Sequence, residues 1–251
     1  MSSIPGKVAL ITGSGKRRVG NMVAKTLAAR GYSIALHYHR SAKEAHETVA
    51  ELKGQGLQAE AFQANVGDEP AVARLFQQTL ERFGRLDVLV TAAALWMPTP
   101  WEEVTALEIR RQFDVNALGT FLCCQQAGRI MVAQPEGGSI ITIGDWACAR
   151  PYTDYAAYFI SKGTLPTMTR MLAVELSRRN TRVRVNCILP GPVMLPVALA
   201  QPEVQGAVAG TLLKRAGSPE HVAHAVMFLV ENDYVTGICL PVDGGRLVAG
   251  G

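Results

Sequence analysis

The chain has 251 residues, of which 48% are hydrophobic and 18% charged, so it can bury a sizeable core and is not expected to be disordered. Its formal net charge of +4 is too small and too dispersed to predict a nucleic-acid partner, but it suits an anionic small ligand. No apolar run approaches the ~18 residues of a membrane span and no basic-then-apolar leader opens the sequence, so we expect a soluble, cytoplasmic protein with no membrane partner.

Short β-rich apolar runs alternate with longer amphipathic stretches along the whole chain. Seven strands are predicted, at residues 8–11, 33–38, 59–63, 88–91, 139–143, 182–188 and 238–242. Helical patterns lie between them, at about 21–30, 42–54, 69–83, 107–132, 155–178 and 219–231. Because strands separated by helices need crossover connections, we predict a single α/β domain over residues 1–251. Its core would be a doubly wound parallel sheet of about seven strands, with helices on both faces.

One segment, residues 190–217, does not follow this alternation. It is rich in Gly, Pro, Ala and Val, and it shows neither a clear strand nor a strong helical pattern. We expect a weakly ordered helix or loop there, which could act as a lid over a substrate site.

The cysteines predict neither disulfides nor a metal site. They form an odd set without C-x-x-C or Cys/His ligand spacing. We therefore expect reduced core residues at Cys123, Cys124, Cys148, Cys187 and Cys239.

The first predicted strand runs into a glycine-rich loop, after which a helix begins. Gly13, Gly15 and Gly20 would let backbone N–H groups approach a pyrophosphate, and the N-terminus of the helix would add the positive end of its dipole. A glycine-rich turn is a weak signal by itself, but its place between a strand and a helix favours a Rossmann-type dinucleotide site.

The second predicted strand ends where an NAD-specific fold usually carries an acidic residue, and no acid is present. The groups available to bind a 2′-phosphate are those of His39, Arg40, Ser41 and, from the first loop, Arg17 or Arg18. This favours NADP(H) over NAD(H). The alternative for any one of these residues is a solvated basic edge of a helix.

Tyr158 and Lys162 are four residues apart in a predicted helix, so they share one face. An ammonium group beside a phenol would lower the pKa of Tyr158 from about 10 toward working pH, so that Tyr158 could donate a proton to a reduced substrate. The spacing alone also fits a surface ion pair. With the glycine loop upstream and Asn116 on a preceding helix, the combination predicts a catalytic site.

The chain resembles the short-chain dehydrogenase/reductase family over essentially its full length. The residues that carry the resemblance are the loop 12–20, Asn116, Tyr158, Lys162, Pro190-Gly191 and Val242-Asp243-Gly244-Gly245. It implies that Asn116 helps to position Lys162 through a water, that Lys162 also reaches the nicotinamide ribose, and that Pro190 and Gly191 lie by the nicotinamide. It also implies a homotetramer built partly from the helix that carries Tyr158.

Two departures from the family pattern are informative. Thr91-Ala92-Ala93-Ala94 stands where an Asn-Asn-Ala-Gly run is common, so polar groups are lost beside Ala93, the expected cofactor contact. Asp145 stands thirteen positions before Tyr158, where most members have a serine that binds a substrate carbonyl. An ionised carboxylate would repel a forming oxyanion, whereas a neutral acid could still donate. A nitrogen heterocycle with N–H groups would be a good partner for Asp145.

Within the family, pteridine reductases resemble this chain at Asp145, at the run 37–41 and at Pro98-Thr99-Pro100. The resemblance implies that Trp96 stacks on the pterin ring. The first loop has one extra residue, so the choice between Arg17 and Arg18 stays open. Asn65 replaces an acid that would usually meet the adenine amino group, which makes that contact less certain.

These observations predict NADPH-dependent reduction of a pterin, with Tyr158 as proton donor and Asp145 orienting substrate N–H groups or relaying a proton. The alternatives are reduction of another carbonyl or imine, since the pocket and not the fold decides the substrate, and a redox-inert NADPH-binding regulator. The intact pair of Tyr158 and Lys162 argues against the last.

Overall fold

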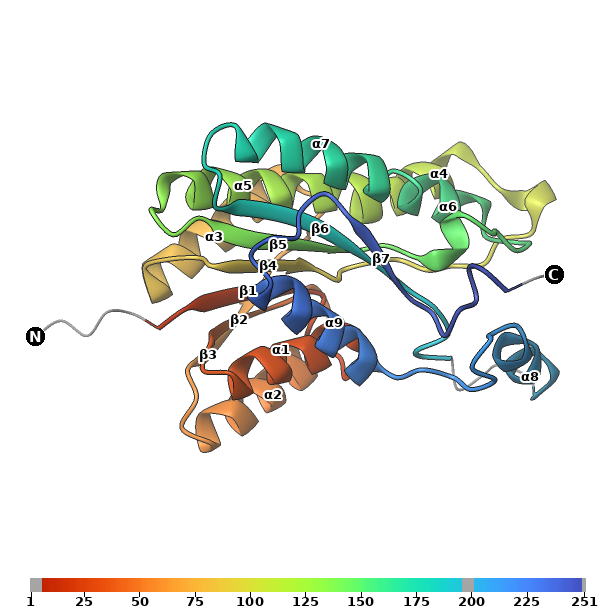
Figure 1. The fold of residues 1–251 in the computed structure, drawn as a ribbon, viewed down its shortest axis with the longest axis horizontal. Coiled ribbons are helices and arrows are strands. Elements are labelled where there is room, and N and C mark those ends of the chain that lie inside the picture. Colours follow the sequence, from red (N-terminus) through yellow and green to blue (C-terminus); the bar gives the residue numbers. More distant parts are fainter. Residues whose placement is uncertain (1–5, 196–200, 250–251) are drawn as a thin grey trace, which may run out of the picture.

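The computed structural model describes residues 6–195 and 201–249, and in these ranges the strands form one parallel sheet (Figure 1). The strands are β1 (Val8–Thr12), β2 (Ser33–Tyr38), β3 (Ala59–Gln63), β4 (Val88–Thr91), β5 (Gly138–Ile143), β6 (Val183–Pro190) and β7 (Cys239–Val242). Their order in space is β3-β2-β1-β4-β5-β6-β7. The order reverses between β1 and β4, so the predicted doubly wound α/β fold is confirmed.

Helices cover both faces of the sheet (Figure 1). One face carries α1 (Val19–Ala29), α2 (Ala42–Gly54) and α9 (Pro219–Glu231), and the other carries α3 (Glu69–Phe83), α5 (Gly119–Ala133) and α7 (Leu165–Ser177). Side chains alternate along a strand. Ile11 therefore packs into the core between the sheet and α1, α2 and α9, and its neighbour Leu10 packs into the core between the sheet and α3, α5 and α7. Both are fully buried, which is why these strands consist almost entirely of apolar residues.

The helix predicted over residues 107–132 is interrupted. It consists of α4 (Ala106–Phe113), a π turn η2 (Asp114–Leu118) and α5, and the N–H of Gly119 donates to the carbonyl of Asp114, five residues earlier. The apolar periodicity runs through this extra residue, so the sequence pattern alone did not reveal it. Such π turns are frequent at functional sites, and Asn116 lies within this one.

The helix predicted over residues 155–178 is two helices, α6 (Ala156–Lys162) and α7. Pro166 lies in the first turn of α7 and has no N–H, so it cannot donate to the carbonyl of Lys162 as a continuous helix would require. Proline is well tolerated in a first turn, where N–H groups lack helical partners anyway. The break therefore makes Lys162 the last residue of α6.

The segment predicted as a possible lid contains a short helix, α8 (Gln201–Ala209), beyond the carboxyl ends of β6 and β7 (Figure 1). Its residues 196–200 lie outside the described part of the chain. The C-terminal residues that follow β7 contact α8 through the side chain of Arg246.

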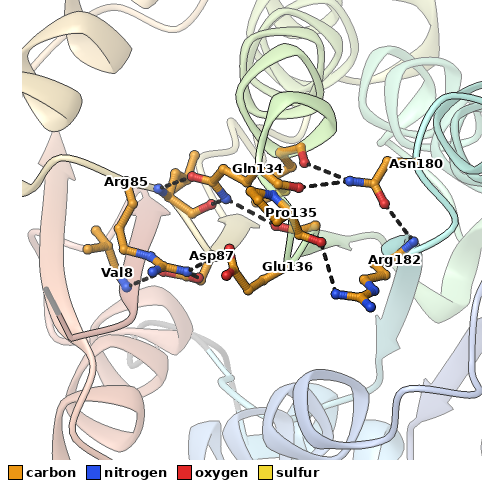
Figure 2. A network of polar contacts seen from close by, with 11 residues as sticks. Val8, Arg85, Asp87, Gln134, Pro135, Glu136, Asn180 and Arg182 are labelled. Atoms are coloured by element: carbon orange, nitrogen blue, oxygen red, sulfur yellow. Dashed lines mark hydrogen bonds and ion pairs between the residues drawn. The ribbon is translucent and has the colours of Figure 1, made fainter. Parts of the chain in front are cut away.

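At the amino ends of the strands, a polar network joins the loops that enter the sheet (Figure 2). Arg85 pairs with Asp87 at 2.5 Å, and the Asp87 carboxylate accepts the N–H of Val8 at 2.8 Å. The Gln134 side chain bonds both backbone groups of Leu86, and Asn180 donates to the Gln134 carbonyl at 2.8 Å. This edge is therefore held by polar groups that are paired with one another.

The five cysteines are free, and Cys123, Cys124 and Cys187 are buried as predicted, whereas Cys148 and Cys239 are only half-buried and not core residues. In the described ranges, no helix is long and apolar enough to span a membrane. Nor does any group of three or more His, Cys, Asp or Glu side chains in those ranges form a possible metal site.

Candidate active site

The glycine-rich loop between β1 and α1 packs tightly against the end of β4. Gly13 has a φ of +65°, and a Cβ there would lie 2.6 Å from the Cα of Ala93. The N–H of Ala93 in turn donates to the hydroxyl of Thr12 at 3.1 Å. A side chain at position 13 would therefore push the two loops apart, which explains the glycine in steric terms.

The side chain of His37 holds this loop by a hydrogen bond, a role that the sequence analysis missed. Its Nδ1 accepts the N–H of Gly13 at 3.0 Å, and its Nε2 lies 3.1 Å from the carbonyl of Ala64, which requires the proton on Nε2. Burial lowers the pKa of His37 to about 4, although the Ala64 carbonyl opposes the shift. The ring is neutral at pH 7 and acts as a fixed spacer between β1, β2 and β3.

The structure brings the first loop and the end of β2 together at Gly15 and Ser41. A Cβ on Gly15 would collide with the hydroxyl of Ser41 and would lie 2.9 Å from the Cβ of Tyr38. His39 and Arg40 are exposed beside this contact. The loops expected to bind the adenosine half of the cofactor thus meet at a point where only glycine fits.

The two arginines of the first loop are both exposed. Arg18 is the residue before α1, and its N–H donates to the carbonyl of Lys16 at 2.7 Å. The charge of Arg17 acts on Glu51 in α2 and helps to lower the pKa of that carboxylate, after the larger effect of a hydrogen bond from Lys25. Asn65 is also exposed and accepts the N–H of Gly67.

Asn116 links the loop after β4 to α6, the helix that carries Tyr158 and Lys162. It is completely buried, and its amide bonds both backbone groups of Leu95, at 2.7 and 2.8 Å. The same amide donates to the hydroxyl of Ser161 at 2.9 Å, and Ser161 donates to the carbonyl of Tyr158. The contact that the structure gives Asn116 on α6 is therefore Ser161, the residue next to Lys162.

Tyr158 and Asp145 form a hydrogen-bonded pair. The Tyr158 hydroxyl donates to Oδ2 of Asp145 at 2.7 Å, and the N–H of Ala147 donates to Oδ1 at 2.8 Å. That second bond belongs to the 3-10 turn η3 (Trp146–Cys148), for which Asp145 is the N-terminal cap. Lys162 is buried beside them and donates to the carbonyl of Ile143 at 2.6 Å.

The electrostatics of this pair correct one expectation. Burial, followed by the charge of Asp145 and its hydrogen bond, raises the pKa of Tyr158 well above its ordinary value, whereas Lys162 was expected to lower it. The Lys162 ammonium is directed at the Ile143 carbonyl, and burial lowers its own pKa. Tyr158 therefore keeps its proton at neutral pH, which is the form that a proton donor needs.

Asp145 is itself shifted. Burial raises its pKa, while the N–H of Ala147, the Tyr158 hydroxyl and the charge of Lys162 act in the opposite direction. A carboxyl group with a raised pKa, bonded to a tyrosine hydroxyl, can accept a substrate N–H when ionised and donate a proton when neutral.

Aromatic side chains extend this site outward. Trp96 stacks on Tyr155 with ring centroids 4.8 Å apart, and its indole N–H donates to the Tyr152 hydroxyl at 3.2 Å. Tyr155 also meets Tyr158 edge to face at 6.4 Å. Phe159 meets Tyr152 edge to face at 4.9 Å, and we call Trp96, Tyr152, Tyr155 and Phe159 the aromatic wall. Of these only Trp96 was predicted, although Tyr152, Tyr155 and Tyr158 recur every three residues in the sequence.

The two C-terminal motifs also lie at the carboxyl edge of the sheet. Gly191 follows β6, its N–H donates to the carbonyl of Val242 at 3.0 Å, and a Cβ on it would lie 2.5 Å from the Cα of Asp243. Asp243 caps the turn that follows by accepting the N–H groups of Gly245 and Leu247. Pro190 and Gly191 are thus held against the motif Val242–Gly245.

A parallel sheet with this glycine loop, and a buried Tyr and Lys pair at its carboxyl edge, defines an oxidoreductase of the dinucleotide-binding type. A model of the family described as Enoyl-(Acyl carrier protein) reductase matches residues 14–246. The chain belongs to the short-chain dehydrogenase/reductase family, whose members use nicotinamide cofactors.

Several relatives are similar over almost their full length. An uncharacterized oxidoreductase of Methylorubrum extorquens is 36% identical, covering 98% of this chain and 99% of its own. Tetrahydroxynaphthalene reductase of Pyricularia oryzae is 31% identical, covering 97% and 90%. The crystal structure of acetoin dehydrogenase from Enterobacter cloacae has a TM-score of 0.88 at 33% identity, covering 99% and 98%.

Proposed function

We propose that this protein reduces a pterin with NADPH, and that Tyr158 donates the proton. The observation that carries the proposal is the 2.7 Å hydrogen bond between Asp145 and Tyr158 beneath an aromatic wall. A carboxyl group in this position suits the N–H groups of a flat heterocycle, and stacked rings suit its faces.

The residues present fit the cofactor. The glycine cradle, in which a Cβ on Gly13 or Gly15 would strike the neighbouring loop, leaves backbone N–H groups at the start of α1 for a pyrophosphate. The 2′-phosphate would be held by Arg40 and Ser41, helped by His39 and by Arg17 or Arg18. The remaining contacts proposed are Gly20, Asn65, Ala93, Lys162, Pro190 and Gly191.

NADPH, when bound, supplies the hydride for a ring carbon of the substrate. Tyr158 then delivers its hydroxyl proton to the adjacent ring nitrogen. Asp145 holds the substrate N–H groups or returns a proton to the tyrosine, since its Oδ2 is already bonded to that hydroxyl. Asn116 fixes α6 through Ser161 and so keeps Tyr158 and Lys162 in place.

Reduction of another carbonyl or imine is the second candidate, and the raised pKa of Asp145 favours it. A neutral carboxyl group could donate to a carbonyl oxygen, as the serine common in the family would. The names of the similar proteins indicate two different kinds of substrate. A naphthalene is flat and aromatic, as a pterin is, whereas acetoin is a small hydroxyketone.

A turnover screen separates the two candidates. Purified enzyme is given NADPH or NADH with pterins, fused-ring aromatic ketones or phenols, small hydroxyketones and cyclic imines, and cofactor oxidation is followed by absorbance at each pH from 5 to 8. The proposal expects the highest kcat/KM with an oxidised pterin. A preference for ketones over pterins would replace it with the second candidate.

We also propose that the whole chain is one domain, that it works in the cytoplasm as a homotetramer, and that residues 190–217 close over the substrate. Exposed apolar side chains at Ile160, Met171 and Val174, on α6 and α7, support the assembly. Light scattering after size-exclusion chromatography measures the molecular mass. A monomer at micromolar concentration would contradict the tetramer.

A further inference from the structure

The C-terminal residues after β7 connect two parts of the site that are far apart in sequence. Nη1 of Arg246 donates to the carbonyls of Gly206, at 3.4 Å, and Ala207. Both carbonyls belong to the last turn of α8, where the helix dipole is negative, and that of Gly206 also accepts the N–H of Gly210 at 3.1 Å. A guanidinium group is well suited to that position.

The same guanidinium reaches the catalytic side. Its Cζ lies 4.6 Å from the centroid of the Trp146 ring, a cation–π distance. Trp146 directly follows Asp145, and the next N–H, that of Ala147, holds the Asp145 carboxyl group. Arg246 therefore contacts the turn that orients Asp145 toward Tyr158.

A second arginine, on the side of the η3 turn, bonds the C-terminal residues in return. Arg150, just beyond η3, donates to the carbonyl of Arg246 at 3.1 Å and to that of Ala249. The carbonyl of Gly244 also accepts the N–H groups of Leu212 and Leu213, just after α8. The C-terminal residues are thus bonded to α8 on one side and to the η3 turn on the other.

Helix α8 also has an electrostatic link to the aromatic wall. The pKa of Tyr155 is raised by burial and, next in size, by the carboxylate of Glu203 in the first turn of α8. The charge at the end of α8 that Arg246 does not hold therefore acts on the ring on which Trp96 stacks. A shift of α8 would move the Glu203 charge relative to that ring.

We propose that Arg246 is a positioning residue of the substrate site: it holds α8 against the turn that carries Asp145. This rests on the proposed function only in its kinetic consequence. Loss of the contact would loosen α8 and the η3 turn together. It would raise KM for the substrate and leave unchanged the loops proposed to bind the adenosine half of NADPH, which follow β1 and β2.

The test replaces Arg246 with methionine, which keeps an unbranched apolar side chain and removes the charge. Hydrogen exchange of amides 203–212 is expected to become roughly three- to tenfold faster, because a cation–π contact and charge-assisted bonds at a helix end are lost. KM for the best substrate should rise by a similar factor, while kcat changes less and the Kd for NADPH is unchanged.

Lys214→Met is the matched control. Lys214 donates to the carbonyl of Ala209 at 2.7 Å, so it also places a cation at the C-terminus of α8, but it has no contact with Trp146. This variant should leave KM near the wild-type value. If Lys214→Met raises KM as much as Arg246→Met, a general effect on the helix end explains both and the proposal is overturned.

Gly210→Ala provides a second variant that keeps the arginine. A Cβ at this position would strike the guanidinium group of Arg246, lying 2.9 Å from its Cζ, and would displace it from α8 and Trp146. Faster exchange in both Arg246→Met and Gly210→Ala supports the proposal, and unchanged exchange in Arg246→Met refutes it. Exchange needs no substrate, so an enzyme that reduces no pterin would overturn the proposed function alone.

Discussion

The two edges of the sheet use buried charge in opposite ways. At the amino edge, Asp87 is ion-paired with Arg85 and bonded to a backbone N–H, and this pairing raises the pKa of Arg85 (Figure 2). At the carboxyl edge, burial is the largest influence on the pKa values of Asp145, Tyr158 and Lys162. It raises the first two and lowers the third, and so favours the uncharged form of each group. The first arrangement favours a fixed charge, whereas the second favours groups that can exchange protons.

This contrast predicts that substitutions at the carboxyl edge change catalysis, and that substitutions at the amino edge change stability. The largest effect is expected for Tyr158→Phe, which removes the proposed proton donor and should lower kcat/KM by ~10²–10⁴-fold. NADPH affinity should stay nearly the same, because the cofactor loops are untouched. Steady-state assays measure kcat/KM, and a fluorescence titration with NADPH measures the affinity. The exposed Tyr234, changed to phenylalanine, serves as control, and near-normal turnover of Tyr158→Phe would refute the assignment.

His37 provides the next largest effect, this time on acid stability. Its folded-state pKa of about 4 lies below the ordinary 6.5, so the folded protein binds fewer protons than the unfolded chain between these values. The stabilisation is complete above pH 6.5 and is lost as pH falls toward 4. It amounts to about 3 kcal/mol, taking about 1.4 kcal/mol for each pKa unit.

Urea unfolding of wild type and His37→Gln at pH 7.5, 6, 5 and 4 measures this contribution. The variant should lose its part of the pH dependence and start from a lower stability at pH 7.5. His46→Gln, on the exposed side of α2, is the control. Identical pH slopes in wild type and His37→Gln would show that His37 titrates normally.

Arg40 sharpens the comparison at the cofactor end of the carboxyl edge. Charge-assisted bonds to a 2′-phosphate are worth ~1.5–3 kcal/mol, so Arg40→Ala should reduce the preference for NADPH over NADH by roughly ten- to a hundredfold. The ratio of kcat/KM for the two cofactors measures it. Lys53→Ala, at the far end of α2 and paired with Glu60, should leave the ratio unchanged. If wild type uses NADH equally well, the interpretation of residues 37–41 fails.

Asp87→Ala tests the amino edge. It removes the partner of Arg85 and leaves the N–H of Val8 without its acceptor, at a cost of about 2 kcal/mol in the free energy of unfolding. Because the carboxyl edge is separate, kcat/KM at a temperature where the variant is folded should match wild type. Asp233→Ala, at an exposed site, is the control for charge. A loss of activity without a loss of stability would break the contrast.

The fold could be predicted in detail because its signals are local. The buried strands are short apolar runs, and Tyr158 and Lys162 stand at a spacing that any helix places on one face. The breaks at Pro166 and at the π turn were missed, since the apolar period continues across both. The pKa of Tyr158 went in the unexpected direction, because burial and the distance to Asp145 are set by the folded chain. For the same reason, the sequence analysis gave His37 no role beyond its place in the strand 33–38.

The smallest effect concerns Trp96 and the aromatic wall. One face of its indole is covered by Tyr155, and 40% of the side chain is exposed, so a flat substrate can meet the outer face. Stacking adds ~0.5–1.5 kcal/mol beyond the burial of area, and Trp96→Ala should therefore raise KM for a pterin roughly two- to tenfold and spare NADPH affinity. Trp96→Phe should recover much of the loss, because a phenyl ring can still stack on Tyr155. Trp101→Ala, in the same loop but 73% exposed, is the matched control. Unaltered pterin kinetics in Trp96→Ala, or a complex with the indole turned away from the ligand, would leave Asp145 and Tyr158 as a general reductase site without an aromatic wall for the substrate.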